Sequence, residues 1–106
     1  MSSRLYITCY RHMAIDDFNR IISAPMTPPL SEMFIDITHE SIMSDAAPKW
    51  TSFCCVHAEE DCCLAFAPPG QEVTADADYH FVGAGERLFY GISEGFRIAV
   101  IERIIK

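Results

Sequence analysis

The 106-residue chain lacks any apolar run long enough to span a bilayer. The longest candidate, residues 96–105, contains two arginines and a glutamate, whereas a transmembrane helix needs about 20 predominantly apolar residues. The first residues, Met1 to Tyr6, also lack the continuous apolar stretch of a secretory signal. The two absences predict a protein that has no membrane partner and stays in a reducing compartment.

Basic residues are scarce, with 8 Lys and Arg against 15 Asp and Glu and a net charge of −7. Between Trp50 and Glu86 the chain has no Lys or Arg at all. A surface of this sign repels phosphate, which argues against direct nucleic-acid binding through a basic groove. The carboxylates at 59–61 and 76–78 fall in predicted turns, where we expect them to be solvated, although an acidic face could also meet a basic protein.

Cysteines are few and odd in number, which favours free thiols over a disulfide framework. The pairs Cys54-Cys55 and Cys62-Cys63 resemble a metal knuckle without its usual two-residue spacers. In a regular hairpin adjacent side chains point to opposite faces, so the four thiolates cannot converge on one zinc. Two cross-strand disulfides are conceivable if 54 faces 63 and 55 faces 62, but a reducing cytosol opposes them. The redox state stays open, and packing of the thiols in or just beneath the core is favoured, with no metal or cofactor.

No set of residues forms a credible catalytic constellation. Residues 57–59, His-Ala-Glu, match half of the zinc deaminase signature, but its downstream Pro-Cys-x-x-Cys is missing. Residues 91–95 match Gly-x-Ser-x-Gly, but a strand is expected after Ser93 and no histidine follows it. Gly83-Ala84-Gly85 lacks the third glycine of a phosphate loop and is expected to be a turn. The scattered histidines without metal-ligand spacing are His12, His39 and His80. We therefore predict a non-enzymatic protein with no catalytic, cofactor-binding or metal-binding residues.

Short β-like runs separated by turn residues make up the second half of the chain. The expected strands are 50–57, 62–67, 79–82, 87–92 and 96–105, preceded by 5–10 and 33–38. About seven short strands with turns too short for crossover helices predict an all-β, antiparallel β-sandwich or jelly-roll-like domain. Across the turn at 93–95 we expect 88, 90 and 92 to oppose 98, 100 and 102 on one buried face. The aromatic series expected to pack the core is Tyr79, Phe81, Phe89, Tyr90 and Phe96.

The one compositional shift lies at 24–31, Ala-Pro-Met-Thr-Pro-Pro-Leu-Ser, where proline removes backbone donors and fixes extended geometry. It predicts an N-terminal strand and Pro-containing arm over residues 1–32 and a β-sandwich over 33–106, together one structural domain. Within the arm, Ile15, Phe18 and Ile22 have near-helical spacing, although Asp16 and Asp17 suit a turn equally well.

The order of these segments resembles small β-sandwich virion-associated proteins of tailed bacteriophages, of the capsid decoration or cement type. The residues that carry the resemblance are the arm at 24–32, the strand at 34–38, the short segment at 44–47, Asp61-Cys62-Cys63-Leu64-Ala65-Phe66, the aromatic segment at 79–89 and the closing strand at 95–101. The resemblance implies a non-enzymatic virion structural protein that is present in the host cytoplasm before assembly. Its implied partners are the major capsid protein or another virion protein, and further copies of itself in a homo-oligomer.

A different class of function stays open beside this one. Small size and acidic charge also suit a phage inhibitor of a host nucleic-acid-binding defence complex, similar to anti-CRISPR proteins. Such a mimic of DNA needs carboxylates spaced along one face, whereas here they gather mainly in turns.

Overall fold

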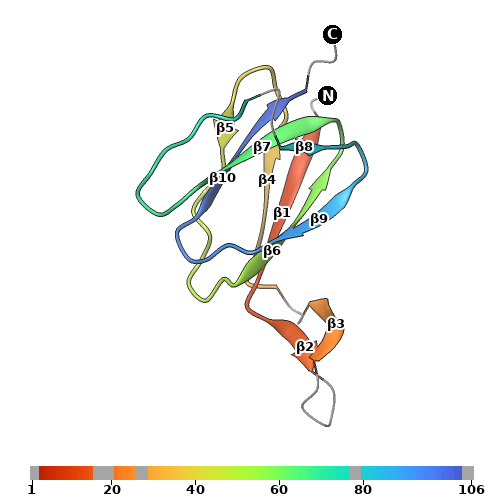
Figure 1. Ribbon diagram of the computed structural model, residues 1–106, viewed down its shortest axis with the longest axis vertical. Coiled ribbons are helices and arrows are strands. Elements are labelled where there is room, and N and C mark those ends of the chain that lie inside the picture. The colour runs from red at the N-terminus through yellow and green to blue at the C-terminus, as the bar shows by residue number, and fades with distance from the viewer. Residues whose placement is uncertain (1–2, 16–20, 26–28, 77–79, 104–106) are drawn as a thin grey trace.

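The computed structural model describes residues 3–15, 21–25, 29–76 and 80–103, and every regular element in these ranges is a β-strand. One four-stranded sheet has the order β4 (Ser31–Asp36), β1 (Arg4–Tyr10), β6 (Phe53–Ala58) and β9 (Arg87–Tyr90). A second has the order β5 (Ile42–Met43), β10 (Arg97–Glu102), β7 (Cys62–Ala67) and β8 (Phe81–Val82). A separate hairpin of β2 (Met13–Ile15) and β3 (Ile21–Pro25) extends below the two sheets in Figure 1. All pairings are antiparallel, which confirms the predicted all-β sandwich.

The core lies between the two sheets because side chains alternate along the strands. In β1, Leu5, Ile7 and Cys9 are buried, and in β6 every second residue from Cys54 is fully buried. The core residues are Leu5, Ile7, Cys9, Ile35, Ile37, Ala47, Cys54, Val56, Ala58, Cys62, Leu64, Val82, Ile92, Ile98 and Val100. Full burial of one large aliphatic side chain contributes roughly 1.5–3 kcal/mol, so this layer is the main stabilising term of the fold.

The second sheet is covered on its other face as well. Cys63 and Ala99 are fully buried, although their neighbours Cys62 and Val100 already point into the core. The segment that joins β7 to β8 returns past β5, where the backbone N–H of Ala75 donates to Ser41 Oγ (2.8 Å). Burial on both faces explains why Cys62–Ala67 reads as a nearly continuous apolar run without alternation.

The strand of the predicted arm belongs to the sandwich. β1 is an interior strand, paired with β4 on one side and with β6 on the other. The sandwich therefore already includes β1, and the arm expected over residues 1–32 is shorter than predicted. The part that leaves the sandwich lies between the end of β1 and Leu30, whose N–H donates to Cys9 O (2.8 Å).

The helix considered for Met13 to Ile22 is wrong. Residues 13–15 and 21–25 are antiparallel strands, and residues 16–20, with Asp16, Asp17 and Phe18, lie outside the described residues. The isoleucines that produced the near-helical spacing have β-branched side chains, which favour extended backbone.

Two expected hairpins are also wrong, because consecutive strands enter different sheets. β6 and β7 lie in opposite sheets, as do β9 and β10. Leu88 and Tyr90 therefore pack against the core from one sheet, while Ile98 and Val100 enter it from the other. The turn at 93–95 carries the chain from one sheet to the other, with Gly95 at φ 87°.

We expect Leu5→Ala to lower the free energy of unfolding by about 2–5 kcal/mol, because Leu5 is fully buried in the core and its truncation leaves a cavity there. Urea denaturation followed by circular dichroism measures the loss. The matched control is Thr8→Ala in the same strand, whose side chain points out of the sandwich and should cost less than about 1 kcal/mol. Equal effects of the two substitutions would show that β1 does not contribute to the core.

Candidate protein-interaction face

The side chains of the first sheet that point away from the core form a surface that we call the outer face. Its members are Arg4, Tyr6, Thr8 and Tyr10 from β1, Glu32, Phe34 and Asp36 from β4, Phe53, Cys55 and His57 from β6, and Arg87 and Phe89 from β9. These side chains alternate with the buried residues of the same strands. The register that places the buried residues in the core therefore also determines which side chains lie on the outer face. The outer face is therefore rich in aromatic rings.

Neighbouring rings on the outer face contact each other across strands. The ring centroid of Tyr6 lies 6.4 Å from that of Phe34 and 6.3 Å from that of His57. Phe53 stacks on Tyr10 at 5.2 Å and reaches Phe89 at 6.2 Å. Cross-strand aromatic pairs of this kind add roughly 0.2–1 kcal/mol each and hold the rings in place. The face is a preformed layer of aromatic groups spread over four strands.

Much of this aromatic surface is open to solvent. Phe34 is 54% exposed, Phe89 is 57% exposed and Tyr6 is 37% exposed. In a two-layer sandwich the solvent side of an antiparallel sheet usually carries polar residues, and contiguous apolar patches mark interaction sites. Phenylalanine on that side is therefore unfavourable for an isolated chain and becomes favourable when another molecule covers it.

Charged groups lie at the two edges of the outer face and have opposite signs. β4 contributes Glu32 and Asp36 on one edge, and β9 contributes Arg87 on the other. Arg4 lies near the acidic edge, with Nε 3.8 Å from Asp36 Oδ1 and its guanidinium 4.1 Å from the Phe34 ring centroid. An exposed ion pair of this kind contributes only about 0–1 kcal/mol to folding. An aromatic centre with a charged rim is the usual composition of a protein interface.

Trp50 forms a further exposed aromatic group at the end of the sandwich nearest the β2–β3 hairpin. The ring is 58% exposed, and the Arg11 guanidinium and the Lys49 ammonium each lie 5.0 Å from its centroid. The backbone of Trp50 has φ 77°, a left-handed conformation that is costly for a bulky residue. No local pattern indicates this corner, because Trp50 falls at the start of the strand expected over residues 50–57, whereas β6 begins at Phe53.

The cross-strand cysteine pairs considered for a β6–β7 hairpin are not present. β6 and β7 lie in different sheets, so Cys54 cannot face Cys63, and it lies opposite Cys9 in the register with β1. All five cysteines lie among the described residues, and none of them is in a disulfide. Cys54 and Cys62 belong to the core, where burial raises the pKa of each thiol to about 12.

Cys55 differs from the other cysteines because it lies on the outer face and is only half-buried. Partial burial raises the pKa of the Cys55 thiol, and the nearby Arg87 guanidinium opposes that rise. The other cysteines are fully buried, Cys63 on the covered side of the second sheet.

The remaining motif residues lie apart from one another in the fold. His57 is on the outer face, Ser93 is in the exposed turn between sheets, and residues 83–85 form a turn in which Glu86 N–H donates to Gly83 O (3.0 Å). His80 Nε2 lies 2.9 Å from Tyr90 Oη, and His39 is exposed. Within the described ranges, no group of three or more His, Cys, Asp or Glu side chains could hold a metal ion. Two members of the aromatic series expected in the core, Phe81 and Phe89, are exposed, and Tyr79 lies outside the described residues.

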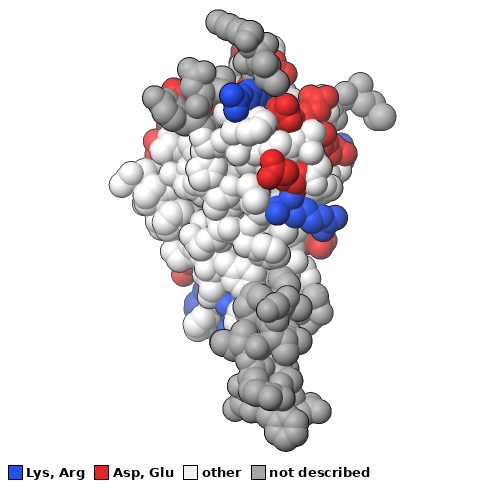
Figure 2. All heavy atoms as spheres, turned by 45° about the vertical axis from the view of Figure 1, so that its right-hand side comes forward, with Lys and Arg blue, Asp and Glu red and all other residues white. Residues whose placement is uncertain are grey.

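Carboxylates hold the turns at the end of the sandwich opposite the hairpin. The N–H of Arg4 donates to Glu59 Oε1 (2.7 Å), and the N–H of Ala84 donates to Asp61 Oδ1 (2.8 Å). Glu86 Oε1 accepts from the N–H of Gly83 (2.8 Å). Figure 2 shows acidic groups gathered toward the upper end of the molecule, while uncharged side chains cover most of the middle. These carboxylates are therefore structural turn caps as well as surface charges.

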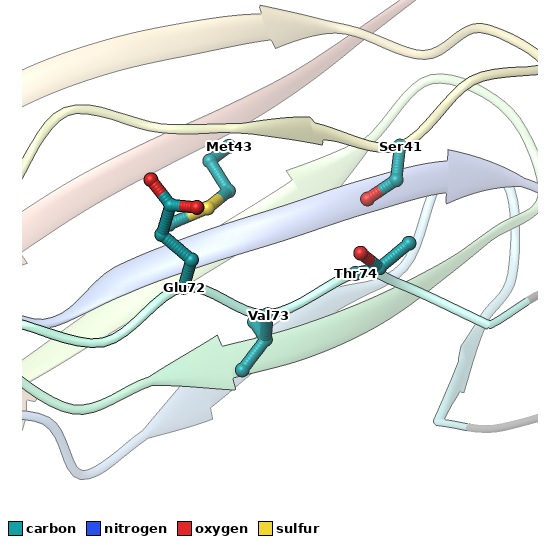
Figure 3. Close-up of a pocket in the computed structure, with 5 residues that line it drawn as sticks. All are labelled: Ser41, Met43, Glu72, Val73 and Thr74. Carbon is teal, nitrogen blue, oxygen red and sulfur yellow. The ribbon is translucent and has the colours of Figure 1, made fainter.

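A surface cavity beside β5 contains no set of groups that could react together. It has a volume of about 650 Å³ and lies between β5 and the segment after β7. Its lining residues are Ser41, Met43, Glu72, Val73 and Thr74 (Figure 3). Among these, Glu72 is the one ionisable side chain, so the cavity contains no acid–base pair or nucleophile with its base.

Comparison with protein-family models, with curated proteins and with solved structures finds no match. The described residues include no helix long and apolar enough to cross a membrane. The candidate site therefore rests on the geometry of the outer face.

In the native protein we expect a thiol reagent at pH 8 to label Cys55 rapidly and the other four cysteines only after denaturation, because those four are fully buried. Labelling of Cys55 should rise with pH as its thiolate forms, and Arg87→Gln should slow it by removing the charge that lowers its pKa. Stopped-flow absorbance with Ellman's reagent measures both rates, with Arg97→Gln as the control. Rapid labelling of several thiols in the folded state would contradict the burial of the cysteine pairs.

Proposed function

We propose that this chain is a non-enzymatic structural protein of a phage virion that acts by binding other proteins, as a capsid decoration or cement protein. Its partners are the major capsid protein or another virion protein, and copies of itself. The observation that carries the proposal is the exposed aromatic outer face, with Phe34 and Phe89 both more than half exposed. The virion setting comes from the resemblance of the segment order to phage decoration proteins.

A binding role fits the composition of the outer face. Aromatic residues and arginine are enriched where interfaces gain most of their binding energy, and the face presents both. Its rings are held by cross-strand contacts, as between Tyr10 and Phe53, so little conformational entropy is lost when a partner covers them.

The β2–β3 hairpin offers a second contact element. It extends from the end of the sandwich where β1 ends and β4 begins, as Figure 1 shows. A rigid body with a projecting hairpin can bind two neighbours at once, which is what a cement protein must do. The exposed Trp50 lies at the same end and extends the available contact surface.

The acidic end of the molecule is the feature that would support the alternative, an inhibitor that mimics nucleic acid. Glu59, Asp61 and Glu86 each accept a hydrogen bond from a backbone N–H, so their positions follow from the turns that they stabilise. A mimic of DNA requires charges spaced like phosphates along one face. The outer face, with both signs of charge and a wide aromatic centre, favours protein docking over this alternative.

Quantitative mass spectrometry of purified particles from the source should find this chain in near-stoichiometric ratio to the major capsid protein. The variant with Phe34→Ser and Phe89→Ser should be depleted from particles by at least about tenfold, since it removes the two most exposed aromatic rings of the outer face. Ile42→Ser is the matched control, because Ile42 is an exposed apolar residue on the other sheet. Absence of the wild-type chain from washed particles, despite expression, would refute the virion role and favour the inhibitor.

Replacing residues 11–29 by Asn-Gly should leave the sandwich folded, because the β1–β4 register continues to Cys9 opposite Ser31, and the N–H of Leu30 donates to Cys9 O at the point where the chain is rejoined. We expect the free energy of unfolding, measured by urea denaturation, to change by less than about 1 kcal/mol. Binding to particles should become weaker. Circular dichroism and particle sedimentation measure the two effects. Full particle binding without the hairpin would assign attachment to the sandwich alone.

A further inference from the structure

We infer that the occupant of the outer face is a second copy of this chain, packed face to face about a two-fold axis parallel to the strands. The inference rests on the proposed function, in that it names the partner that covers the outer face. It leaves the β2–β3 hairpin and the Trp50 corner of both copies available to other proteins.

The register places the outer-face residues in rows that cross the sheet. One row is Phe34, Tyr6, His57 and Arg87, and the next is Glu32, Thr8, Cys55 and Phe89. Each row therefore has a β4 residue at one edge and a β9 residue at the other. Because the two rows end in oppositely charged groups at opposite edges, the face is asymmetric across the strands.

A two-fold axis parallel to the strands, between β1 and β6, lays β4 of one copy over β9 of the other. Each row then faces itself in reverse order. Phe34 meets Arg87 of the second copy, and the carboxylates of Glu32 and Asp36 flank that guanidinium two residues away on either side. Arginine over an aromatic ring with carboxylates beside it combines cation–π attraction and ion pairing in one contact.

The centre of the same arrangement is also complementary. Tyr6 meets His57 of the second copy, and both already belong to a stacked pair within one chain, with ring planes 25° apart. Thr8 meets Cys55 of the second copy, so one row of small side chains lies at the axis between the larger ring pairs Tyr6–His57 and Tyr10–Phe53. The two sheets can then pack at the small angle usual for aligned β-sheets.

The other in-plane two-fold axis, perpendicular to the strands, is disfavoured by charge. It lays β4 over β4 and β9 over β9, which brings Glu32 and Asp36 near the same acids of the second copy and Arg87 near Arg87. Like charges across an interface cost several kcal/mol when they are desolvated. The placement of charges at the edges thus selects the axis parallel to the strands.

The area of the outer face indicates how tightly two copies of the chain can bind each other. Four strands about 4.8 Å apart and some six residues of about 3.4 Å give a footprint of roughly 19 by 20 Å. Such a footprint is roughly 400 Å² per copy, which is below the standard size of stable specific complexes and in the range of weak, transient ones, so we expect a dimer that dissociates on dilution through the micromolar range.

Analytical ultracentrifugation of the purified full chain across a dilution series tests the arrangement. The wild type should show a concentration-dependent dimer, and Arg87→Glu or Glu32→Arg alone should raise the dissociation constant at least about tenfold. The double variant carrying both changes should return to within about threefold of the wild type, because the charge pair is restored with exchanged signs.

The matched control is Glu94→Arg, an exposed charge reversal in the turn outside the outer face, which should leave the dissociation constant unchanged. Circular dichroism shows whether each variant is folded, as expected for exposed positions. A wild type that stays monomeric at every concentration, or a double variant that is no better than the singles, would overturn the inference.

Cross-linking gives a second readout that needs no charge change. A short bismaleimide should produce covalent dimers through Cys55, which lies near the axis, and Cys55→Ser should abolish them. The other four thiols are fully buried and serve as internal negatives. Absence of Cys55-linked dimers at concentrations where sedimentation shows dimers would mean that another surface forms the contact.

Failure of this inference is distinguishable from failure of the proposed function. A monomeric chain whose particle binding is lost on Phe34→Ser with Phe89→Ser would keep the virion role and assign the outer face to a different protein. A dimer with the expected charge rescue that is absent from particles would keep the inference and refute the virion role.

Discussion

The pairing of β1 with β6 is the constraint on which the rest of this structure depends. Residues that lie some fifty positions apart in the chain align as Leu5 with Ala58 and Cys9 with Cys54. This register turns Leu5, Ile7, Cys54 and Val56 toward the second sheet. A shift by one residue would expose the whole set, so the hydrophobic effect specifies the register strongly.

The same pairing determines the outer face. When the small and aliphatic side chains of β1 and β6 point inward, Tyr6, Tyr10, Phe53 and His57 must point outward. The core and the candidate interface are thus two consequences of one alternating pattern. The chain gains its stability from the inner side, where burial of aliphatic groups contributes most, while the aromatic layer on the outer side remains available for a partner.

Charge has a different role from burial in this protein. The acidic turns at the end opposite the hairpin use carboxylates to satisfy backbone N–H groups, as Asp61 does for Ala84. Arg87, on the rim of the aromatic layer, is also close enough to Cys55 to oppose the rise of its pKa. Basic residues are scarce, and three of them lie over exposed aromatic rings: Arg4 over Phe34, and Arg11 and Lys49 over Trp50.

The all-β class, most strand positions and the turns at the glycines could be predicted from the amino-acid order alone, because alternation and turn chemistry are local properties. Cys62–Ala67 matched the predicted strand at both ends, and residues 83–85 formed the expected turn. Which strands pair with each other depends on long-range contacts and is seen only in the folded chain. A turn such as 59–61 or 93–95 reverses the chain whether it closes a hairpin or crosses to the other sheet, so the cysteine register and the β9–β10 pairing could not be predicted. The outer face was missed for the same reason: the side of a sheet that Phe89 faces depends on long-range pairing with β6, which no local pattern encodes.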